Sequence, residues 1–182
     1  MALITENGWR QCRRDECVNP VVPGTADVRP EVRAGDAATI LIAWCAWWHA
    51  HVMRIDTYRP RDYWGWSPTN AIWNSNHLSG TAIDLNSTSL PWKRYAMPAD
   101  LVTRVREGVR LFEGTVWWGG DWPEAYVDQM HTQLALPEGH PRLRTFAARL
   151  SEGYLGVFGS PAPSDDDDPV WDLVLHQLRG TV

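Results

Sequence analysis

The stretch SNHLSGTAIDLN, residues 75–86, holds a histidine, a glycine and an aspartate at fixed offsets. His77 and Asp84 are seven positions apart, so in one continuous strand their side chains would face opposite sides. They can point to the same side only if the chain turns between them. Gly80 can supply that turn, because glycine adopts backbone conformations that other residues avoid. The stretch therefore predicts a loop that leads into a strand and brings an imidazole and a carboxylate together.

The second half of this stretch, residues 81–86, has the alternation of a strand. Ala82 and Asp84 would lie on one face, and Ile83 and Leu85 on the other. A chain of 182 residues is long enough for one domain with a real core, so we expect the remaining elements to pack around this strand. Those elements are an irregular segment over 1–34, a buried helix over 37–52 capped by Asp36, a strand over 53–59, a long loop over 59–76, a helix over 99–114, a strand, turn and strand over 115–118, 119–123 and 125–136, and a helix over 142–153.

A second segment offers a third metal ligand. A catalytic zinc site typically takes three protein ligands and keeps a fourth position open. The segment YVDQMHTQL, residues 126–134, contains His131 and, three positions before it, Asp128. This offset does not align the two side chains on a flat strand, which indicates a bulge, a bend or a strand end. If His131 binds a metal, Asp128 is near enough to exchange a proton with the attacking water. Isolated histidines and aspartates are also common structural groups, so spacing alone leaves that interpretation open.

The complete pattern is more specific than its parts. It reads S-x-H-x-x-G-x-A-x-D over residues 75–84, W-G-G-x-W over 118–122 and D-x-x-H over 128–131. The pattern resembles the zinc peptidases that include D-alanyl-D-alanine carboxypeptidases and phage L-alanyl-D-glutamate endopeptidases, from Thr57 to Gln133. The resemblance implies an α+β fold of the hedgehog and D,D-peptidase kind, in which a small antiparallel sheet carries the zinc site and helices flank it.

The resemblance also implies roles for the residues of the pattern. By position, His77, Asp84 and His131 would bind Zn²⁺, and Asp128 would be the catalytic base. An aspartate rather than a glutamate as base looks more like the phage endopeptidases. The implied function is a zinc-dependent endopeptidase of a phage endolysin that cuts the peptide stem of peptidoglycan. Two alternatives remain open, namely a D-alanyl-D-alanine carboxypeptidase with the same metal and a non-catalytic wall-binding module.

Substrate contacts follow from the same resemblance. The related peptidases carry an arginine after a strand, where it steadies the substrate carbonyl or carboxylate. Arg59 is the candidate for this role, and Arg61 is its competitor. Ser75, Trp118 and Trp122 are candidate substrate-binding residues.

Aromatic and thiol side chains give weaker signals. Twelve tryptophans are unusual in so short a chain, and we expect most of them in the core. Trp64, Trp66 and Trp122 lie among glycines and prolines in expected loops, where they could stack on a sugar or a peptide. The three cysteines form no metal framework. Cys12 and Cys17 are expected as reduced thiols, with a disulfide between them as the alternative.

The overall composition limits the partners. A formal net charge of -5 with scattered basic residues argues against nucleic acid as a partner. No apolar run reaches the length of a membrane span, and the first residues lack the basic and apolar regions of a secretory signal. We therefore expect a monomer that stays in the host cytoplasm until it is released to the cell wall.

The chain is expected to divide near its C-terminal end. Residues 1–158 would form the zinc peptidase domain. Residues 159–169 would form an acidic, Pro-rich linker, because prolines stiffen the segment and four successive aspartates repel one another. Residues 170–182 begin with apolar residues and would be a docking helix or the start of a further domain.

Overall fold

The computed structural model describes residues 3–58 and 60–159. Arg59, all but the first residue of the expected linker, and the expected C-terminal segment 170–182 lie outside the described residues. The helices are α1 (Asp36–His51), α2 (Ala99–Leu111) and α3 (Pro141–Ser151). The strands are β1 (Cys17–Val18), β2 (Val32–Arg33), β3 (Tyr63–Trp64), β4 (Ala82–Leu85), β5 (Val116–Trp118) and β6 (His131–Leu134). The short 3₁₀ helices are η1 (Arg14–Glu16), η2 (Asn76–Ser79), η3 (Gly119–Asp121), η4 (Glu124–Tyr126) and η5 (Tyr154–Gly156).

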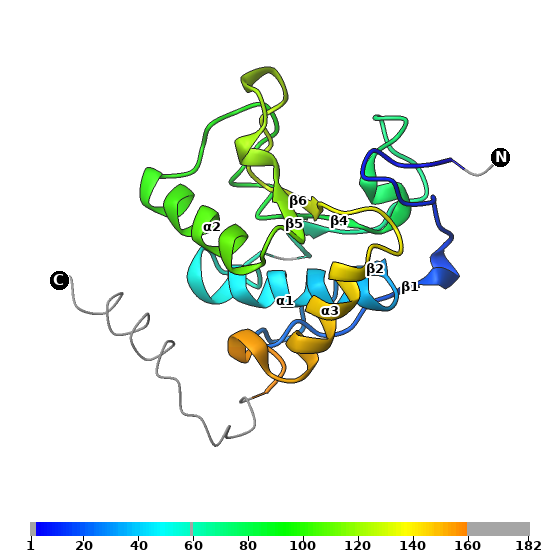
Figure 1. Cartoon of the computed structure of the whole chain (residues 1–182). Coiled ribbons are helices and arrows are strands. Elements are labelled where there is room, and N and C mark those ends of the chain that lie inside the picture. The colour runs from blue at the N-terminus through cyan, green and yellow to red at the C-terminus, as the bar shows by residue number, and fades with distance from the viewer. Residues whose placement is uncertain (1–2, 59, 160–182) are drawn as a thin grey trace.

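The strands form two antiparallel sheets (Figure 1). β1 and β2 pair with each other, and the larger sheet has the order β3-β4-β6-β5. The two segments that the sequence marked, one from each motif, are therefore the two central strands of the larger sheet. This is the α+β architecture with a small antiparallel sheet and flanking helices that the resemblance implied.

Helix α1 is the centre of the core. Eleven of its 16 residues are buried, and it packs against α3 and against the central strands β4 and β6 (Figure 1). The prediction that Asp36 caps this helix was wrong by one position. The cap is Gly35, whose φ of 81° suits a residue without a side chain. Asp36 is the first helical residue, where its negative charge is favourable near the helix N-terminus.

The larger sheet has one apolar face and one polar face. Across β4 and β6, Asp84 is paired with His131 and Ala82 with Gln133. Residues directly paired in antiparallel strands have their side chains on the same face, so Asp84 and His131 lie side by side. The intervening residues face the core, and these are Ile83, Leu85, Leu134, Val116 and Trp118. The sheet is thus a platform whose lower face is buried against α1 and whose upper face presents polar side chains.

The strand predicted over residues 53–59 is absent from the described part of that range. The chain there bends, and side chains satisfy its polar groups. The Arg54 guanidinium pairs with the Asp56 carboxylate at 2.9 Å, and the Asn86 amide donates to the Arg54 carbonyl at 2.7 Å. The Arg54 carbonyl is thus bound by a side chain rather than by a neighbouring strand. The next strand starts only at Tyr63.

The tryptophans divide between the core and the surface. Five of the eleven described tryptophans are buried, so the prediction that most lie in the core was wrong. The buried ones are Trp9, Trp44, Trp47, Trp48 and Trp118, and the clearly exposed ones are Trp64, Trp73, Trp92 and Trp117. Single exposed rings are normal on a protein surface, whereas a contiguous exposed apolar patch points to a binding site, so the question is where these rings lie together.

Candidate metal centre

The loop that carries His77 is held in place by its own ends. Ser75 precedes η2, and its hydroxyl accepts a hydrogen bond from the His77 amide at 3.3 Å. Gly80 ends η2 with a φ of 68° and leads directly into β4. The predicted turn at Gly80 is therefore present. It brings His77 to the same side of the sheet as Asp84, which an extended chain could not do.

Replacing Gly80 with alanine should destabilise the fold for two reasons. A left-handed conformation costs a residue with a side chain roughly 1–2 kcal/mol. In addition, a Cβ at Gly80 would lie 2.7 Å from the Arg33 amide nitrogen and 3.2 Å from Cys17 Sγ. We expect the free energy of unfolding, measured in urea, to fall by more than the conformational cost alone. Gly139→Ala is the matched control, because Gly139 has a φ of 80° and open space around it. Equal losses in the two variants would contradict a steric requirement at Gly80.

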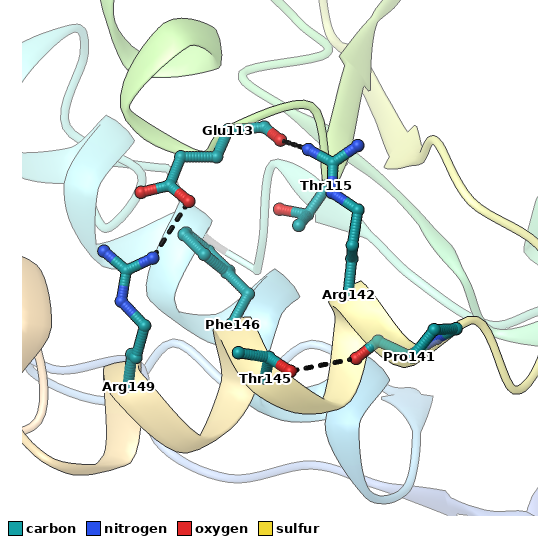
Figure 2. Close-up of a pocket in the computed structure, with 7 residues that line it drawn as sticks. All are labelled: Glu113, Thr115, Pro141, Arg142, Thr145, Phe146 and Arg149. Carbon is teal, nitrogen blue, oxygen red and sulfur yellow. Dashed lines mark hydrogen bonds and ion pairs between the residues drawn. The ribbon is translucent and has the colours of Figure 1, made fainter.

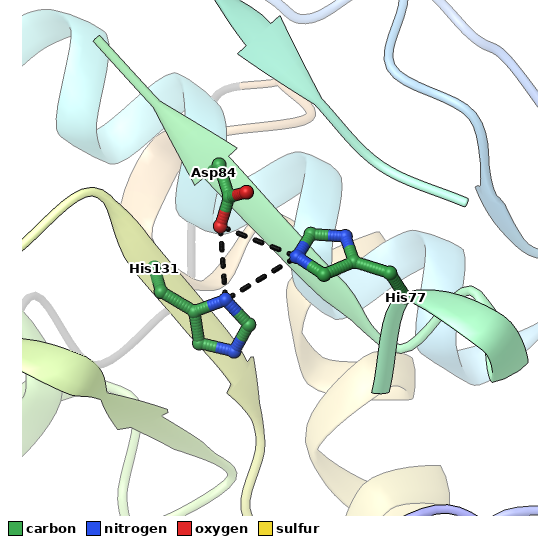
Figure 3. A group of neighbouring side chains, drawn as sticks. All are labelled: His77, Asp84 and His131. Carbon is green, nitrogen blue, oxygen red and sulfur yellow. Dashed lines mark hydrogen bonds and ion pairs between the residues drawn. The ribbon is translucent and has the colours of Figure 1, made fainter. Parts of the chain in front are cut away.

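Three ligand atoms converge above the centre of the sheet (Figure 3). His77 Nε2 lies 3.3 Å from Asp84 Oδ1 and 3.3 Å from His131 Nδ1, and the last two atoms are 2.9 Å apart. Tetrahedral zinc with ligands at about 2.0–2.1 Å sets ligand-to-ligand distances of roughly 3.3 Å. The three predicted ligands therefore meet at a spacing that suits a small divalent cation.

The donor set also fits a metal. His77 Nδ1 lies 2.7 Å from the Gly65 carbonyl oxygen, which can only accept a hydrogen bond. Nδ1 therefore carries the proton, and Nε2 turns its lone pair toward Asp84 and His131. A backbone carbonyl behind a metal-binding histidine commonly fixes the tautomer in this way. Gly65 has no room for a side chain, because a Cβ would overlap the Glu31 carbonyl.

Charge within the site is concentrated and buried. Burial alone would lower the pKa of His77, but the adjacent Asp84 carboxylate outweighs it and raises that pKa above its ordinary value. Burial would raise the pKa of Asp84, and the two histidines instead hold it well below its usual range. A proton and a metal ion thus compete for the same lone pairs.

Asp128 lies beside the ligands, just before β6 begins. The His131 amide donates to the Asp128 carbonyl at 3.2 Å, and His131 is the first residue of the strand, so the expected strand end is present. Asp128 Oδ1 is buried without a hydrogen-bond partner. Burial, assisted by the nearby Asp84 carboxylate, raises the pKa of Asp128 to about 6. A carboxyl group with such a pKa can exchange protons near neutrality.

The W-G-G-x-W motif makes room for this arrangement. The Gly119 carbonyl accepts from the Asp128 amide at 3.0 Å. A Cβ at Gly119 would lie 2.5 Å from the Asp128 carbonyl oxygen and 3.3 Å from His131 Cβ. Only glycine at position 119 allows η3 to lie this close to Asp128 and His131. Gly119 therefore determines how these two residues lie relative to each other.

The ligands lie in a cleft of about 640 Å³. Apolar and aromatic side chains form much of its wall, and the ring of Trp122 lies 5.1 Å from the His131 ring. The larger side chains of the wall are Ile72, Trp92, Trp117, Trp122, Tyr126 and Met130. Of these, Ile72, Trp92, Trp117 and Tyr126 are exposed, so the cleft brings three exposed aromatic rings together.

Of the three predicted substrate-binding residues, two line the cleft and one lies in the core. Ser75 and Trp122 line the cleft. Trp118 of β5 is paired with Thr132 of β6 on the core face of the sheet and is buried. Trp117 is paired with Gln133 on the polar face and lines the cleft. Trp118 therefore does not face the cleft as predicted, and its neighbour Trp117 does.

Other expected residues lie away from the cleft. The Arg61 guanidinium lies over the Trp64 ring, 4.3 Å from its centroid, and does not line the cleft. Trp66 donates its indole N–H to the Cys12 carbonyl at 3.2 Å, which gives it a structural contact. The sulfur atoms of Cys12 and Cys17 are 3.6 Å apart and are not bonded.

A smaller hollow, of about 190 Å³, lies between α3 and the end of α2 (Figure 2). The charged groups that line it are paired with groups of the same hollow. The Arg149 guanidinium pairs with the Glu113 carboxylate at 2.9 Å, and Arg142 donates to the Glu113 carbonyl. These contacts fasten α3 to the end of α2, and they give the hollow a structural explanation.

Several residues of the site gave no signal in the sequence. Gly65 supplies a carbonyl to His77, Gln133 contacts His131, and Glu6 contacts Gln133 at the edge of the cleft. Gln133 could have been found, because it is two positions after His131 and so shares its face. Glu6 lies too far from the other residues in sequence for any spacing rule to connect them.

Comparison with known proteins agrees with this geometry. Residues 68–134 match the model of a family described as D-alanyl-D-alanine carboxypeptidase, and the matched segment contains the three ligands and Asp128. A search of curated proteins and a search of solved structures found no match. The family match and the His-Asp-His site together identify the chain as a metallopeptidase. Within the described residues, no helix has the length and apolar content to cross a membrane.

Proposed function

We propose that the chain is a zinc-dependent peptidoglycan endopeptidase of a phage endolysin, which hydrolyses an amide bond in the stem peptide. The observation that carries the proposal is the set of three ligand atoms in an open cleft, beside a buried carboxylate, that of Asp128, whose Oδ1 has no hydrogen-bond partner. Two histidines and one carboxylate match the ligand types of catalytic zinc sites, which leave a position open for water or substrate.

The residues of the chain divide the chemistry between them. A bound zinc ion supplies polarisation of the scissile carbonyl and a lower pKa for the attacking water. Asp128 accepts the proton of the water and transfers it to the leaving nitrogen, for which a pKa of about 6 in the metal-free protein is well suited. The aromatic wall of the cleft positions the stem peptide and excludes bulk water.

The lining of the cleft favours an internal bond over a terminal one. A carboxypeptidase must bind a free carboxylate, which proteins usually do with an arginine or lysine. Among the described residues that line the cleft, none is arginine or lysine, whereas Glu6, Asp84 and Asp128 are acidic. An internal amide has no charge to neutralise at this point. Arg59, which lies outside the described residues, remains the candidate for a contact with the substrate carbonyl.

The setting of the enzyme follows from the same proposal. An acidic chain with scattered basic residues suits a peptide substrate rather than a nucleic acid. We place the protein in the host cytoplasm until its release to the cell wall, where it acts as a monomer on peptidoglycan.

The test is mass spectrometry of purified peptidoglycan after digestion with the zinc-loaded protein, beside a sample treated with a chelator. We expect new amino termini inside the stem peptide, in the zinc-loaded sample alone, and their position identifies the bond. Release of free D-alanine without internal cleavage would instead establish a carboxypeptidase. Binding to the wall without any cleavage would establish a non-catalytic module.

Zinc binding should become more stabilising as the pH rises. The raised pKa of His77 means that its protonated form stabilises the metal-free protein below about pH 6.5, and this contribution is lost as the pH rises through the folded-state pKa. Zinc requires the deprotonated imidazole. The increase in Tm on adding zinc should therefore be larger at pH 8 than at pH 6 in differential scanning calorimetry. An equal increase at both values would show that His77 releases no proton when the metal binds.

A further inference from the structure

The N-terminal residues 5–9 join the two segments that carry the metal ligands. The Glu6 amide donates to the Asn74 carbonyl at 2.9 Å, and the Asn7 amide donates to Asn76 Oδ1 at 3.0 Å. The Asn7 side chain also donates to the Leu134 carbonyl at the end of β6, at 3.0 Å. Figure 1 shows the dark blue N-terminal chain beside the segment that precedes β4. These residues lie outside the matched range 68–134, and Glu6 lines the cleft.

The side chain of Glu6 ends a row of three polar groups. Glu6 Oε2 accepts from Gln133 Nε2 at 2.7 Å and from Asn76 Nδ2 at 3.0 Å. The other polar atom of the Gln133 amide, Oε1, lies 3.1 Å from His131 Nε2. The opposite nitrogen of that ring, Nδ1, is the atom that faces Asp84 and His77. The row therefore runs from a carboxylate at the edge of the cleft to a metal ligand.

The direction of every hydrogen bond in this row follows from Glu6, the carboxylate at its outer end. An ionised carboxylate can only accept, so the amide of Gln133 must turn its NH₂ group toward Glu6. Its carbonyl oxygen must then face His131 Nε2, which has to carry a proton. A proton on Nε2 leaves the lone pair of the neutral ring on Nδ1, toward the metal position. The amide alone could adopt either orientation, and Glu6 removes that freedom.

We propose that Glu6 is a positioning residue that sets the metal-binding tautomer of His131 through Gln133. This inference rests on the metal site of the proposed function. Without an acceptor at position 6, the Gln133 amide can present its NH₂ group to His131 and favour the tautomer that has its proton on Nδ1. That tautomer cannot bind the metal through Nδ1, so the proton must first move to Nε2, and the cost of this change lowers the net binding free energy. Losing a partner behind a metal ligand typically weakens metal binding by about 10- to 100-fold.

The test measures zinc affinity by competition with a chromophoric chelator. We expect Glu6→Ala to bind zinc about 10-fold more weakly than the wild type. Glu6→Gln should lie between the two, because its amide oxygen can still accept from Gln133 but its NH₂ group also permits the reversed orientation of the Gln133 amide. Glu138→Ala is the matched control, since Glu138 also accepts from the N-terminal segment, at the Arg10 amide, but has no contact with the site. A wild-type affinity in Glu6→Ala would overturn the proposal.

Two further measurements separate this role from simple anchoring of the N-terminal segment. Because Glu6 acts through Gln133, Glu6→Ala should weaken zinc binding no further in a Gln133→Ala background. If the two losses in zinc affinity were fully additive, Glu6 would not act through Gln133, and the proposal would fail. In ¹⁵N NMR of the zinc-loaded wild type, His131 should bind zinc through Nδ1 and keep a slowly exchanging proton on Nε2, which Glu6→Ala should make exchange faster. Binding through Nε2 would overturn the proposal.

The outcomes also distinguish the two proposals. If the wild type binds zinc with the expected dependence on Glu6 but cleaves no peptidoglycan, the inference about Glu6 stands and the proposed function fails. If the wild type binds no zinc, both fail together.

Discussion

Replacing Asp128 with asparagine is expected to lower kcat for stem-peptide cleavage by about 10²- to 10⁴-fold, the usual contribution of a general base. Asparagine has the same shape and keeps the backbone contacts of Asp128 with Gly119 and His131. It cannot take the proton from the attacking water. The three ligands are unchanged, so zinc affinity should stay within a few-fold of the wild type. Cleavage is measured as new amino termini in digested peptidoglycan, and zinc affinity by competition with a chelator.

The control for this variant is Asp121→Asn. Asp121 lies on the neighbouring η3 and pairs with Arg106 at 2.7 Å, so it has its own partner away from the ligands. We expect this variant to cleave at the wild-type rate. Full activity in zinc-loaded Asp128→Asn would refute the assignment of Asp128 as the base. A loss of zinc from that variant would show instead that the carboxylate is needed to hold the site together.

The metal ligands could be predicted because short-range rules place them. Gly80 is the one residue between His77 and Asp84 that turns the chain easily, and the alternation of β4 directs Asp84 away from the core. The structure adds one fact that the sequence does not contain. Asp84 and His131 are directly paired across two strands, although 46 residues separate them. Their common side of the sheet depends on this register, which no local pattern specifies.

The errors of prediction have the same origin. Trp117 and Trp118 are adjacent, and nothing in their own sequence says which one faces the core. The answer comes from the pairing of β5 with β6, where a shift by one residue would exchange their places. In residues 53–59, a weak alternation suggested a strand, but the described residues of that range form none, and the Arg54 carbonyl accepts a hydrogen bond from the distant Asn86 side chain instead. In each case, tertiary contacts decided what local pattern left open.

Glu6 shows the furthest limit of reading from sequence. Its contacts reach Asn76 and Gln133, 70 and 127 positions away. Each of these bonds is ordinary by itself, and a glutamate in an irregular N-terminal segment has no periodicity that would mark it. The residue becomes informative only when the fold brings the segment against both ligand-bearing elements. A search limited to the motif would therefore describe the ligands and miss what orients one of them.

Replacing Asp84 with alanine is expected to abolish zinc-dependent behaviour altogether. The carboxylate is the one negatively charged ligand, and its Oδ1 lies within 3.3 Å of both ligating nitrogens. Two imidazoles alone leave the site one ligand short of the three that catalytic zinc sites use. Zinc affinity should fall by more than the roughly 100-fold that loss of an outer partner can cause. Peptidoglycan cleavage should fall to the level of the chelated wild type.

Thermal unfolding distinguishes this loss from a general weakening of the fold. A ligand at 100 times its Kd stabilises a protein by about 2.7 kcal/mol, so the wild type should show a clear rise in Tm with zinc. Asp84→Ala should show none. The matched control is Asp62→Ala, which removes a buried aspartate that does not line the cleft and whose Oδ1 accepts from Ser87 and Thr88. That variant should be less stable overall but retain the rise with zinc. If Asp84→Ala also kept the rise, zinc would bind elsewhere, and the site built from His77, Asp84 and His131 would lose its role.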